Sequence, residues 1–376
     1  MLILNKLQRR VDRMKEGILV TGATGFLGIH IVKELVMQLN QRIYCLVRGK
    51  TIEDAKDKFR QLLKWYFNEQ YAEILGRVTL ICGDFTKDYF GLSREKYEEL
   101  GKNIVKVIHT GAIVKHFGIM EDYRLTNVTG TKNMVDFCKR FDAFLLFTSS
   151  VAVLNYMDTS EACWTYQDEK KVDLYVWSKI IAEKTITEAM KQGLKASILR
   201  IGALFGRYED GVFQKNISEN AVCARIKTMI VGGKLPTRFL DSNVELMPVD
   251  YCSKVIVYIL LEEKEGFLCL YNNNTVIYRE LIEILKKLGY PVISQDYQDF
   301  LSFANDLKEY PLKRELFTGF YFHYKRRRNN QRKPQEVNCE ITERYLKSNQ
   351  MQWPKITTRY IEVLINHMRK QGYLPE

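Results

Sequence analysis

The first half of the chain alternates short apolar runs with longer stretches in which apolar residues recur at helical spacing. The helical stretches include 51–67 and 125–141. Strands alternating with helices in this way predict parallel βαβ crossovers in a doubly wound α/β sheet of Rossmann type. The predicted strands lie at 17–22, 42–47, 77–84, 106–112, 144–150 and 195–202.

The second half of the chain has a looser pattern. Beyond about residue 204, a glycine-punctuated stretch leads into several helical patterns, the last of them at 359–376. The expected division is an N-terminal linker at 1–16, an α/β domain at 17–203, and a smaller, mainly helical lobe at 204–376 with some crossing of the chain between the two.

Three spaced glycines separate the first predicted strand from the first helix, in the sequence TGATGFLG. Gly22 would make the tight turn, Gly25 would let backbone N–H groups approach a pyrophosphate, and Gly28 would let the helix pack close to the strand. A strand before the glycines and a helix after them is the context of a dinucleotide-binding loop. The expected cofactor contacts in this loop are Thr21, Gly22, Thr24, Gly25, Phe26, Leu27 and Gly28.

The residue after the second predicted strand distinguishes NADP from NAD. An acidic residue there binds the ribose 2′-hydroxyl of NAD, whereas an arginine accommodates the 2′-phosphate of NADP. The chain has Arg48 at this point, roughly twenty residues past the last glycine. We therefore expect NADPH as the cofactor, with Lys50 and Arg60 as further candidate contacts.

The spacing GxxGxxG, rather than GxGxxG, resembles that of the extended short-chain dehydrogenase/reductase family. The resemblance implies a Rossmann fold with NAD or NADP. It also implies an adenine contact at Asp84, with Phe85 beside it, and close backbone approach to the cofactor at Gly111 and Ala112. A simple turn at the end of the third strand is the alternative role for Asp84.

The motif YVWSK places Tyr175 and Lys179 four residues apart and hence on one face of a helix. An ammonium near a phenol favours the phenolate, so we expect Lys179 to lower the pKa of Tyr175 and make it a usable acid or base near neutral pH. Ser150 ends the fifth predicted strand, where parallel sheets present their ligands. Ser150, Tyr175 and Lys179 are the expected catalytic residues, with Ser149 as the nearest rival for the serine and Thr148 as the next.

Longer stretches resemble a narrower group of proteins, the terminal thioester reductase domains of nonribosomal peptide synthetases. These stretches are 107–118, 127–131, 175–184, 198–221 and 245–251. One departure is the sequence HTGA, where those domains often have two alanines after a small or polar residue. His109 and His116 flank this loop. We expect His109 to be buried and hydrogen-bonded, and neither histidine has partners at metal spacing. Lys115 either reaches the cofactor or substrate, or is a solvated loop lysine.

This resemblance implies reduction of an acyl or peptidyl thioester carried on the phosphopantetheine arm of a carrier protein. Ser150 and Tyr175 would stabilise the oxyanion formed by hydride transfer from NADPH, and Tyr175 would supply the proton. Lys179 would hold the nicotinamide ribose. The product is an aldehyde, or an alcohol after a second reduction.

Other functions share the same cofactor residues. A reductase of free acyl-CoA thioesters and another extended short-chain enzyme acting on a small carbonyl or a nucleotide sugar are the enzymatic alternatives. The chain contains no segment that resembles a carrier or adenylation domain. It is therefore interpreted as a stand-alone reductase or, in preference, as an excised terminal domain.

Composition and charge add the expected partners. The net charge of +12 favours acidic partners. The basic run at 324–334 lacks interleaved aromatic residues, so a solvated loop is preferred there over nucleic-acid binding. An NADP-sensing or nucleic-acid-binding protein is the non-enzymatic alternative. For an acidic carrier protein, the candidate contacts are Arg9, Arg10, Lys325, Arg326, Arg327 and Arg328.

The remaining expectations concern the cellular context. Eight cysteines without a CxxC pair predict reduced thiols and no zinc site. No stretch is long and apolar enough to cross a bilayer, and the start lacks a signal-peptide pattern. We expect a cytoplasmic monomer with no membrane or nucleic-acid partner.

Overall fold

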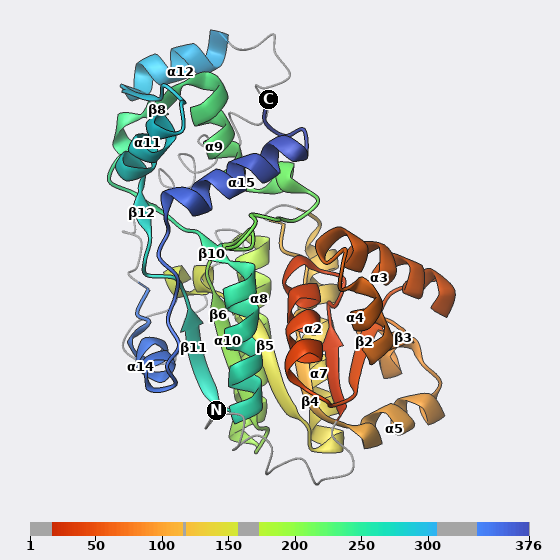
Figure 1. Ribbon diagram of the computed structural model, residues 1–376. Coiled ribbons are helices and arrows are strands. Elements are labelled where there is room, and N and C mark those ends of the chain that lie inside the picture. The colour runs from red at the N-terminus through yellow and green to blue at the C-terminus, as the bar shows by residue number, and fades with distance from the viewer. Residues whose placement is uncertain (1–16, 116–117, 157–172, 307–336, 376) are drawn as a thin grey trace. The chain divides into compact units, whose positions relative to one another are not determined.

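The structure is a computed structural model (Figure 1), and it describes residues 17–115, 118–156, 173–306 and 337–375. The chain divides into two compact units. The first consists of Met1–Ile201 and Ser253–Leu270, and the second of Gly202–Cys252 and Tyr271–Glu376. The chain therefore leaves the first unit and returns to it once before its C-terminal part.

A sheet of seven parallel strands forms the centre of the first unit, in the order β11-β6-β5-β4-β1-β2-β3. This is the strand order of doubly wound dinucleotide-binding folds with one further strand at the edge. The predicted Rossmann-type sheet is confirmed. Its strands are β1 (Gly17–Thr21), β2 (Ile43–Val47), β3 (Val78–Cys82), β4 (Ile104–His109), β5 (Phe144–Ser150), β6 (Ala196–Ile201) and β11 (Gly266–Leu270).

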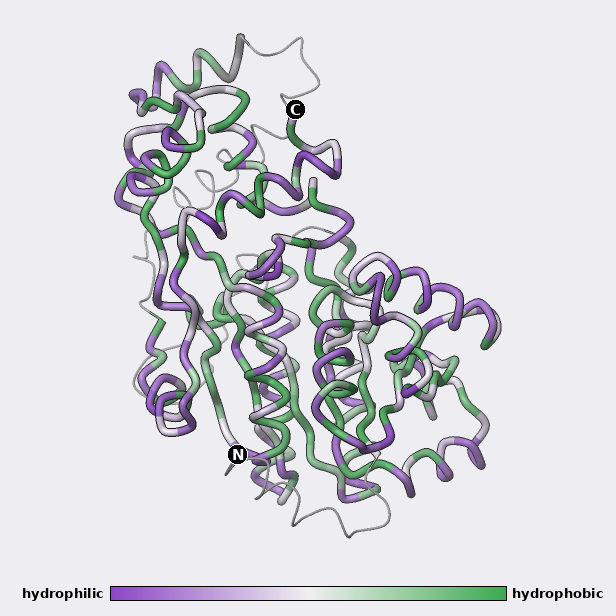
Figure 2. Tube along the Cα trace, in the orientation of Figure 1, coloured by the Kyte–Doolittle hydropathy of each residue, from purple (hydrophilic) through white to green (hydrophobic). Residues whose placement is uncertain are grey.

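Helices flank this sheet (Figure 1). They are α2 (Phe26–Gln38), α3 (Ile52–Tyr66), α4 (Tyr71–Arg77), α5 (Arg94–Asn103), α6 (Met120–Tyr123), α7 (Gly130–Phe141), α8 (Leu174–Lys191) and α10 (Val249–Glu262), the last of which enters the unit at Ser253. The sequence pattern explains their orientation. In α3, for example, most residues are hydrophilic (Figure 2), whereas Ala55, Phe59 and Leu63 recur every four residues and are buried.

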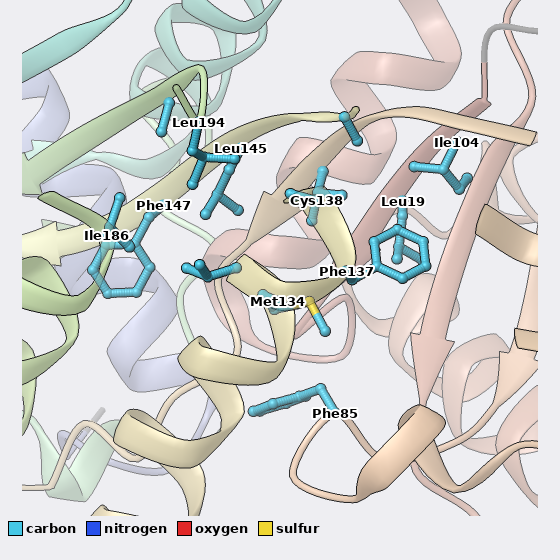
Figure 3. Close-up of a cluster of buried hydrophobic side chains, with 14 of the residues drawn as sticks. Leu19, Phe85, Ile104, Met134, Phe137, Cys138, Leu145, Phe147, Ile186 and Leu194 are labelled. Atoms are coloured by element: carbon cyan, nitrogen blue, oxygen red, sulfur yellow. The ribbon is translucent and has the colours of Figure 1, made fainter. Parts of the chain in front are cut away.

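One large apolar cluster packs helices α5, α7 and α8 against the sheet. Figure 3 shows Leu19 and Leu145 from the strands, Phe137 from α7 and Ile186 from α8 within this cluster. Each of these four side chains is completely buried. The cluster holds the carboxyl ends of β1, β4 and β5 in fixed register, and those ends carry the predicted site residues.

The second unit is mainly helical, as predicted. Its helices are α9 (Ala221–Gly232), α11 (Tyr278–Lys287), α12 (Tyr297–Asp306), α14 (Glu340–Ser348) and α15 (Thr358–Lys370). Its short strands pair two by two. These strands are β7 (Leu204–Phe205) with β10 (Met247–Pro248), β8 (Lys234–Pro236) with β13 (Ile293–Gln295), and β9 (Asn243–Val244) with β12 (Val276–Ile277).

Long-range hydrogen bonds fasten α15 within the second unit. The Tyr360 hydroxyl donates to the carbonyl oxygen of Gly206 at 2.7 Å, and the Phe213 amide donates to His367 Nε2 at 3.2 Å. None of the helices in the described part of the chain has both the length and the apolar character needed to cross a membrane.

Candidate functional site

The glycine loop between β1 and α2 has the geometry that its spacing predicts. Gly22 has a φ of +71°, and a Cβ atom there would lie 2.5 Å from the backbone nitrogen of Gly111. A Cβ atom on Gly28 would collide with the carbonyl oxygen of Gly22. The turn therefore requires glycine at position 22, and the close approach of α2 to the turn requires it at position 28.

This loop forms a cradle suited to an anion. The Gly25 amide donates to the Gly22 carbonyl at 2.8 Å, and Gly25 is the N-cap residue of α2. No side chain caps α2 and no acidic residue lies in its first turn. The positive end of the helix dipole therefore lies at this loop, where it can attract an anion. Among the neighbouring predicted contacts, Thr24 is exposed and Phe26 and Leu27 are half-buried.

The ends of β1 and β4 meet beside this cradle, at the point where the strand order reverses. The Thr110 hydroxyl donates to the carbonyl oxygen of Thr21 at 2.8 Å. The Thr21 hydroxyl is hydrogen-bonded to His109 Nδ1 at 2.6 Å, and the other ring nitrogen of His109 lies 3.3 Å from the Thr131 hydroxyl. Burial, together with the charge of Lys179, lowers the pKa of His109 to about 3. His109 is thus a neutral, buried, hydrogen-bonded residue, as expected.

Phe85 packs in the core beside two glycines of the site and is 6% exposed. A Cβ atom added to Gly111 or to Gly130 would lie 2.5 Å from the Phe85 ring, so the ring leaves room only for glycine at both positions. Ala112, the next predicted contact, is half-buried directly after Gly111.

Asp84 closes a turn after β3. Its Oδ1 atom accepts hydrogen bonds from the Thr86 amide at 3.0 Å and the Thr86 hydroxyl at 2.8 Å. The Asp84 amide donates to the carbonyl oxygen of Phe90 at 2.8 Å. The turn that was the alternative role for Asp84 is therefore present, and it uses one carboxylate oxygen.

The three predicted cations near the 2′-phosphate position differ in their surroundings. Arg48 follows β2 directly, is exposed, and has no hydrogen-bond or ion-pair partner within the described residues. The backbone amide of Lys50 donates to Asp54 Oδ2 at 2.9 Å, which places Lys50 at the start of α3. Arg60 forms an exposed ion pair with Asp57 at 2.6 Å. Arg48 can thus bind a phosphate without giving up a partner, whereas Arg60 would have to leave Asp57.

The structure brings Ser150, Tyr175 and Lys179 together. The Ser150 and Tyr175 hydroxyls are hydrogen-bonded to each other. Asp173 caps α8 by accepting from the Tyr175 amide at 3.0 Å, which fixes the start of the helix. Lys179 Nζ donates to the carbonyl oxygen of Thr148 at 2.7 Å and lies 6.0 Å from the centroid of the Tyr175 ring.

The two rivals of Ser150 have other partners. The Ser149 hydroxyl donates to Glu183 Oε1, and Ser149 is 5% exposed. The Thr148 hydroxyl donates to the carbonyl oxygen of His109 at 3.3 Å and is buried as well. Ser150 is half-buried, and its hydroxyl faces Tyr175. The contacts therefore favour Ser150 over both rivals.

Burial is the main cause of the pKa shifts of Tyr175 and Lys179. It raises the pKa of Tyr175 to about 12, although the hydrogen bond from Ser150 acts in the opposite direction. Burial also lowers the pKa of Lys179 to about 8, against the opposing charge of Glu183. The expectation that Lys179 lowers the pKa of Tyr175 is wrong for this structure. Tyr175 is half-buried, desolvation raises the pKa of its phenol, and the ammonium is directed at the Thr148 carbonyl instead.

Two buried residues at the site were missed by the sequence analysis. Asn127 lies in a π-helical turn, and its side chain bonds both the amide and the carbonyl of Ile113, at 2.7 and 2.9 Å, and the Ser178 hydroxyl at 2.8 Å. Glu183 lies one turn beyond Lys179 and is completely buried. An acidic residue on the same face as Lys179 was a signal for Glu183, whereas the π-helical turn has no sequence signal of its own.

Several residues named in the sequence analysis take no part in the contacts described above. The backbone of Lys115 accepts a hydrogen bond from the Tyr123 hydroxyl at 2.6 Å, and its side chain is exposed. His116 and the cations at positions 9, 10 and 325–328 lie outside the described residues. Within the described residues, no group of three or more His, Cys, Asp or Glu side chains could hold a metal ion.

Comparison with known proteins identifies the family to which the chain belongs. The family described as male sterility protein, an NAD-binding domain family, matches residues 20–256. Among curated proteins, one of the linear gramicidin synthase proteins of Brevibacillus parabrevis is 27% identical over 286 residues, which is 73% of this chain and 6% of that protein. The large subunit of L-2-aminoadipate reductase from Candida glabrata is 29% identical over 310 residues, 75% of this chain and 22% of that protein. The chain thus spans less than a quarter of the length of these relatives.

Solved structures match over nearly the whole chain. The terminal R domain from the myxalamid PKS-NRPS biosynthetic pathway superposes with a TM-score of 0.83 and 27% identity, covering 97% of this chain and 93% of that one. A thiolation-reductase di-domain from an archaeal non-ribosomal peptide synthetase gives a TM-score of 0.81 and 26% identity, covering 98% of this chain and 78% of that one.

Proposed function

Because this chain belongs to the NAD-binding family described as male sterility protein, we propose that it is an NADPH-dependent reductase that releases an acyl or peptidyl group from a carrier-protein thioester as an aldehyde. The observation that carries the proposal is the hydrogen-bonded Ser150–Tyr175 pair with Lys179 beside it. The similarity to a reductase domain and to a thiolation-reductase di-domain supports the choice of substrate.

The residues of the first unit fit a dinucleotide cofactor. The cradle at Gly22, Gly25 and Gly28 would hold the pyrophosphate, because it opens the uncapped N-terminus of α2, whose dipole attracts an anion. Arg48 would bind the 2′-phosphate and Asp84 the adenine. NADPH bound there supplies a hydride to the carbonyl carbon of the substrate.

The Ser150 and Tyr175 side chains then stabilise the negative charge of the reaction and supply its proton. As negative charge develops on the carbonyl oxygen, the Ser150 and Tyr175 hydroxyls donate hydrogen bonds to it. Tyr175 transfers its phenolic proton to that oxygen. A phenol whose pKa is about 12 is protonated at neutral pH, and it gives up its proton only to a strongly basic oxygen such as a developing alkoxide.

Lys179 would hold the nicotinamide ribose of the cofactor. With a pKa of about 8 it is mostly protonated at pH 7, and its bond to the Thr148 carbonyl holds the ammonium near the Tyr175 ring. The hemithioacetal formed on the substrate collapses to the aldehyde. Its C–S bond breaks, and the sulfur leaves as the free pantetheine thiol. Ser150 and Tyr175 therefore account for the stabilisation of the oxyanion, and Tyr175 for the proton that the reduction requires.

Replacing Tyr175 tests the proposal. In Tyr175→Phe, turnover of a carrier-bound acyl thioester should fall by about a hundredfold or more, because the proton donor is lost. NADPH affinity and the circular dichroism spectrum should be retained. Tyr258→Phe, the same chemical change in α10, is the matched control and should keep the rate of the unmodified protein.

Single-turnover rates with saturating NADPH provide the measurement. An unchanged rate in Tyr175→Phe would remove Tyr175 from the chemistry. If the unmodified protein reduced the corresponding free acyl-CoA thioester with the same kcat/KM as the carrier-bound substrate, the carrier would no longer be part of the proposed function.

A further inference from the structure

The end of β5 is bonded to α8 at three consecutive residues. Thr148 accepts from Lys179, Ser149 donates to Glu183, and Ser150 bonds to Tyr175. The three α8 residues occur at intervals of four and therefore share one face of the helix. Two of these three contacts involve the proposed catalytic residues, and the third, between Ser149 and Glu183, lies between them along the strand.

Glu183 is the most constrained member of this set. Its side chain is completely buried, and Arg200 on β6 donates to it from Nη2 at 2.7 Å and from Nε at 3.2 Å. Ser149 and Arg200 are direct partners across the β5–β6 pair, so the carboxylate spans both strands. A buried carboxylate is retained only when its partners satisfy it, and here both strands supply partners.

This position gives Glu183 a geometric effect on the site. Ser149 is the residue between the carbonyl that receives Lys179 and the hydroxyl that bonds Tyr175. Holding the Ser149 side chain therefore fixes the rotation of the strand end on which both neighbours depend. Arg200 is itself held, because its guanidinium lies 4.6 Å from the centroid of the Phe267 ring on β11.

Glu183 also has an electrostatic effect. The groups around Lys179 Nζ are the Thr148 carbonyl, the Phe147 ring at 4.7 Å and the Tyr175 ring at 6.0 Å. Nearby titratable groups are His109, which is neutral, and Glu183, whose charge raises the pKa of Lys179 against its burial. The Arg200 guanidinium acts against that charge from the far side of the carboxylate.

We propose that Glu183 is a positioning residue for the reductase site, which fastens the end of β5 to α8 through Ser149 and places its carboxylate one helical turn from Lys179. This inference rests on the proposed function for its effect on turnover. It is independent of that function for its effect on Lys179, which can be measured without substrate.

The test uses Glu183→Gln in the full chain. The amide can still accept a hydrogen bond from Ser149 but carries no charge. In the protein labelled with ¹³C at the lysine ε-carbons, the titration midpoint of Lys179, assigned by its loss in Lys179→Arg, should move to lower pH. Turnover at saturating NADPH should fall by about tenfold or more, and the Kd for NADPH should stay within about twofold of the unmodified protein.

The pH profile should move in the same direction. If protonated Lys179 is required, turnover is lost as the pH rises through the pKa of Lys179. Removing the carboxylate lowers that pKa, so the alkaline limb of the profile should shift to lower pH in Glu183→Gln. Glu183→Asp, which keeps the charge, should return the Lys179 midpoint toward that of the unmodified protein.

Glu188→Gln is the matched control, since Glu188 lies on the same helix and is exposed. If Glu183→Gln lowers the melting temperature but leaves the Lys179 midpoint and turnover equal to those of Glu188→Gln, the role is only structural and the proposal is overturned. Should Glu183→Gln fail to fold, Ser149→Ala removes the strand contact alone. Turnover must then fall with NADPH affinity retained, and unchanged turnover overturns the proposal.

The failure of the proposed function would look different. An unmodified protein that reduces no thioester would overturn that function, while the Lys179 titration would still report on Glu183. A Lys179 midpoint unaffected by Glu183→Gln in an active enzyme would overturn the electrostatic part of the positioning role and leave the reductase assignment standing.

Discussion

Arg48 is an exposed cation at the end of β2, and its guanidinium has no partner within the described residues. Arg48→Ala should raise the Kd for NADPH by about 10- to 100-fold, because a charge-assisted hydrogen bond to a phosphate contributes about 1.5–3 kcal/mol. The Kd for NADH should change far less, since NADH has no 2′-phosphate. Isothermal titration calorimetry with both cofactors measures the difference.

Arg60→Ala is the matched control for this prediction. Arg60 is also an exposed arginine, but it is paired with Asp57 on its own helix, so its loss should weaken NADPH binding less than the loss of Arg48. Equal weakening of NADPH and NADH in Arg48→Ala would show that Arg48 does not recognise the 2′-phosphate.

At the scale of residues, the sequence was informative where a role depends on spacing along the chain. The intervals between Gly22, Gly25 and Gly28 predict the cradle, and the interval between Tyr175 and Lys179 predicts a shared helix face. The choice between Ser149 and Ser150 could not be predicted, because it depends on partners on α8. The direction of the Tyr175 pKa shift also depends on burial, which is a property of the packed molecule.

At the scale of elements, the turn after β3 has an uncommon backbone. Tyr89, Phe90 and Gly91 are successive left-handed residues, with φ of 50°, 57° and 69°. Phe90 is 1% exposed and its ring packs 5.2 Å from that of Phe137. This packing offsets the cost of left-handed residues that have a Cβ atom, which is about 1–2 kcal/mol each. The same turn supplies the carbonyl to which the Asp84 amide donates.

Gly91→Ala should lower the free energy of unfolding by about 1 kcal/mol. A Cβ atom there would meet only the Lys87 side chain, at 3.5 Å, so the cost is one of backbone conformation and not of a clash. Urea unfolding monitored by circular dichroism measures the change.

Gly76→Ala provides the matched comparison. Gly76 lies in α4, and a Cβ atom there would have no neighbour within 4 Å. Alanine should raise the free energy of unfolding by about 0.5–1 kcal/mol, because glycine is unfavourable in a helix. The two substitutions are chemically identical, so a loss of stability in both would contradict the argument from backbone conformation.

The elements that the sequence predicted are those with a strong local pattern. Six apolar runs became six strands of the sheet. The seventh strand, β11, was not predicted. It is as long as β1, β2 and β3, but it joins the sheet only by pairing with β6 after the chain returns from the second unit, outside the alternating pattern of the first half. The π-helical turn at Arg124–Thr129 falls inside a stretch predicted as helix, and the Asn127 side chain that lies in it bonds to residues outside the turn.

At the scale of the whole molecule, the net charge of +12 has a physical reason in the proposed function. Carrier proteins are usually acidic, and complementary fields speed encounter and orient the partners. The basic run at 324–334, the densest group of cations in the sequence, lies outside the described residues, so its part in docking stays a prediction. Solubility is the competing explanation of the charge.

The dependence of kcat/KM on salt separates these two explanations. Between about 0.1 M and 1 M salt, the Debye length falls from about 10 Å to about 3 Å, so steering by exposed charges is screened. At NADPH concentrations kept saturating, kcat/KM for an acyl thioester on a carrier protein should fall several-fold or more across this range. A short neutral thioester with the same acyl group needs no steering and should respond far less.

In Arg326→Glu/Arg327→Glu, kcat/KM for the carrier substrate should fall at low salt and lose most of its salt dependence. Lys102→Glu/Lys139→Glu, which changes the net charge equally at positions on α5 and α7, should keep that dependence. Parallel salt responses of the two substrates would mean that the charge does not guide a carrier to this site.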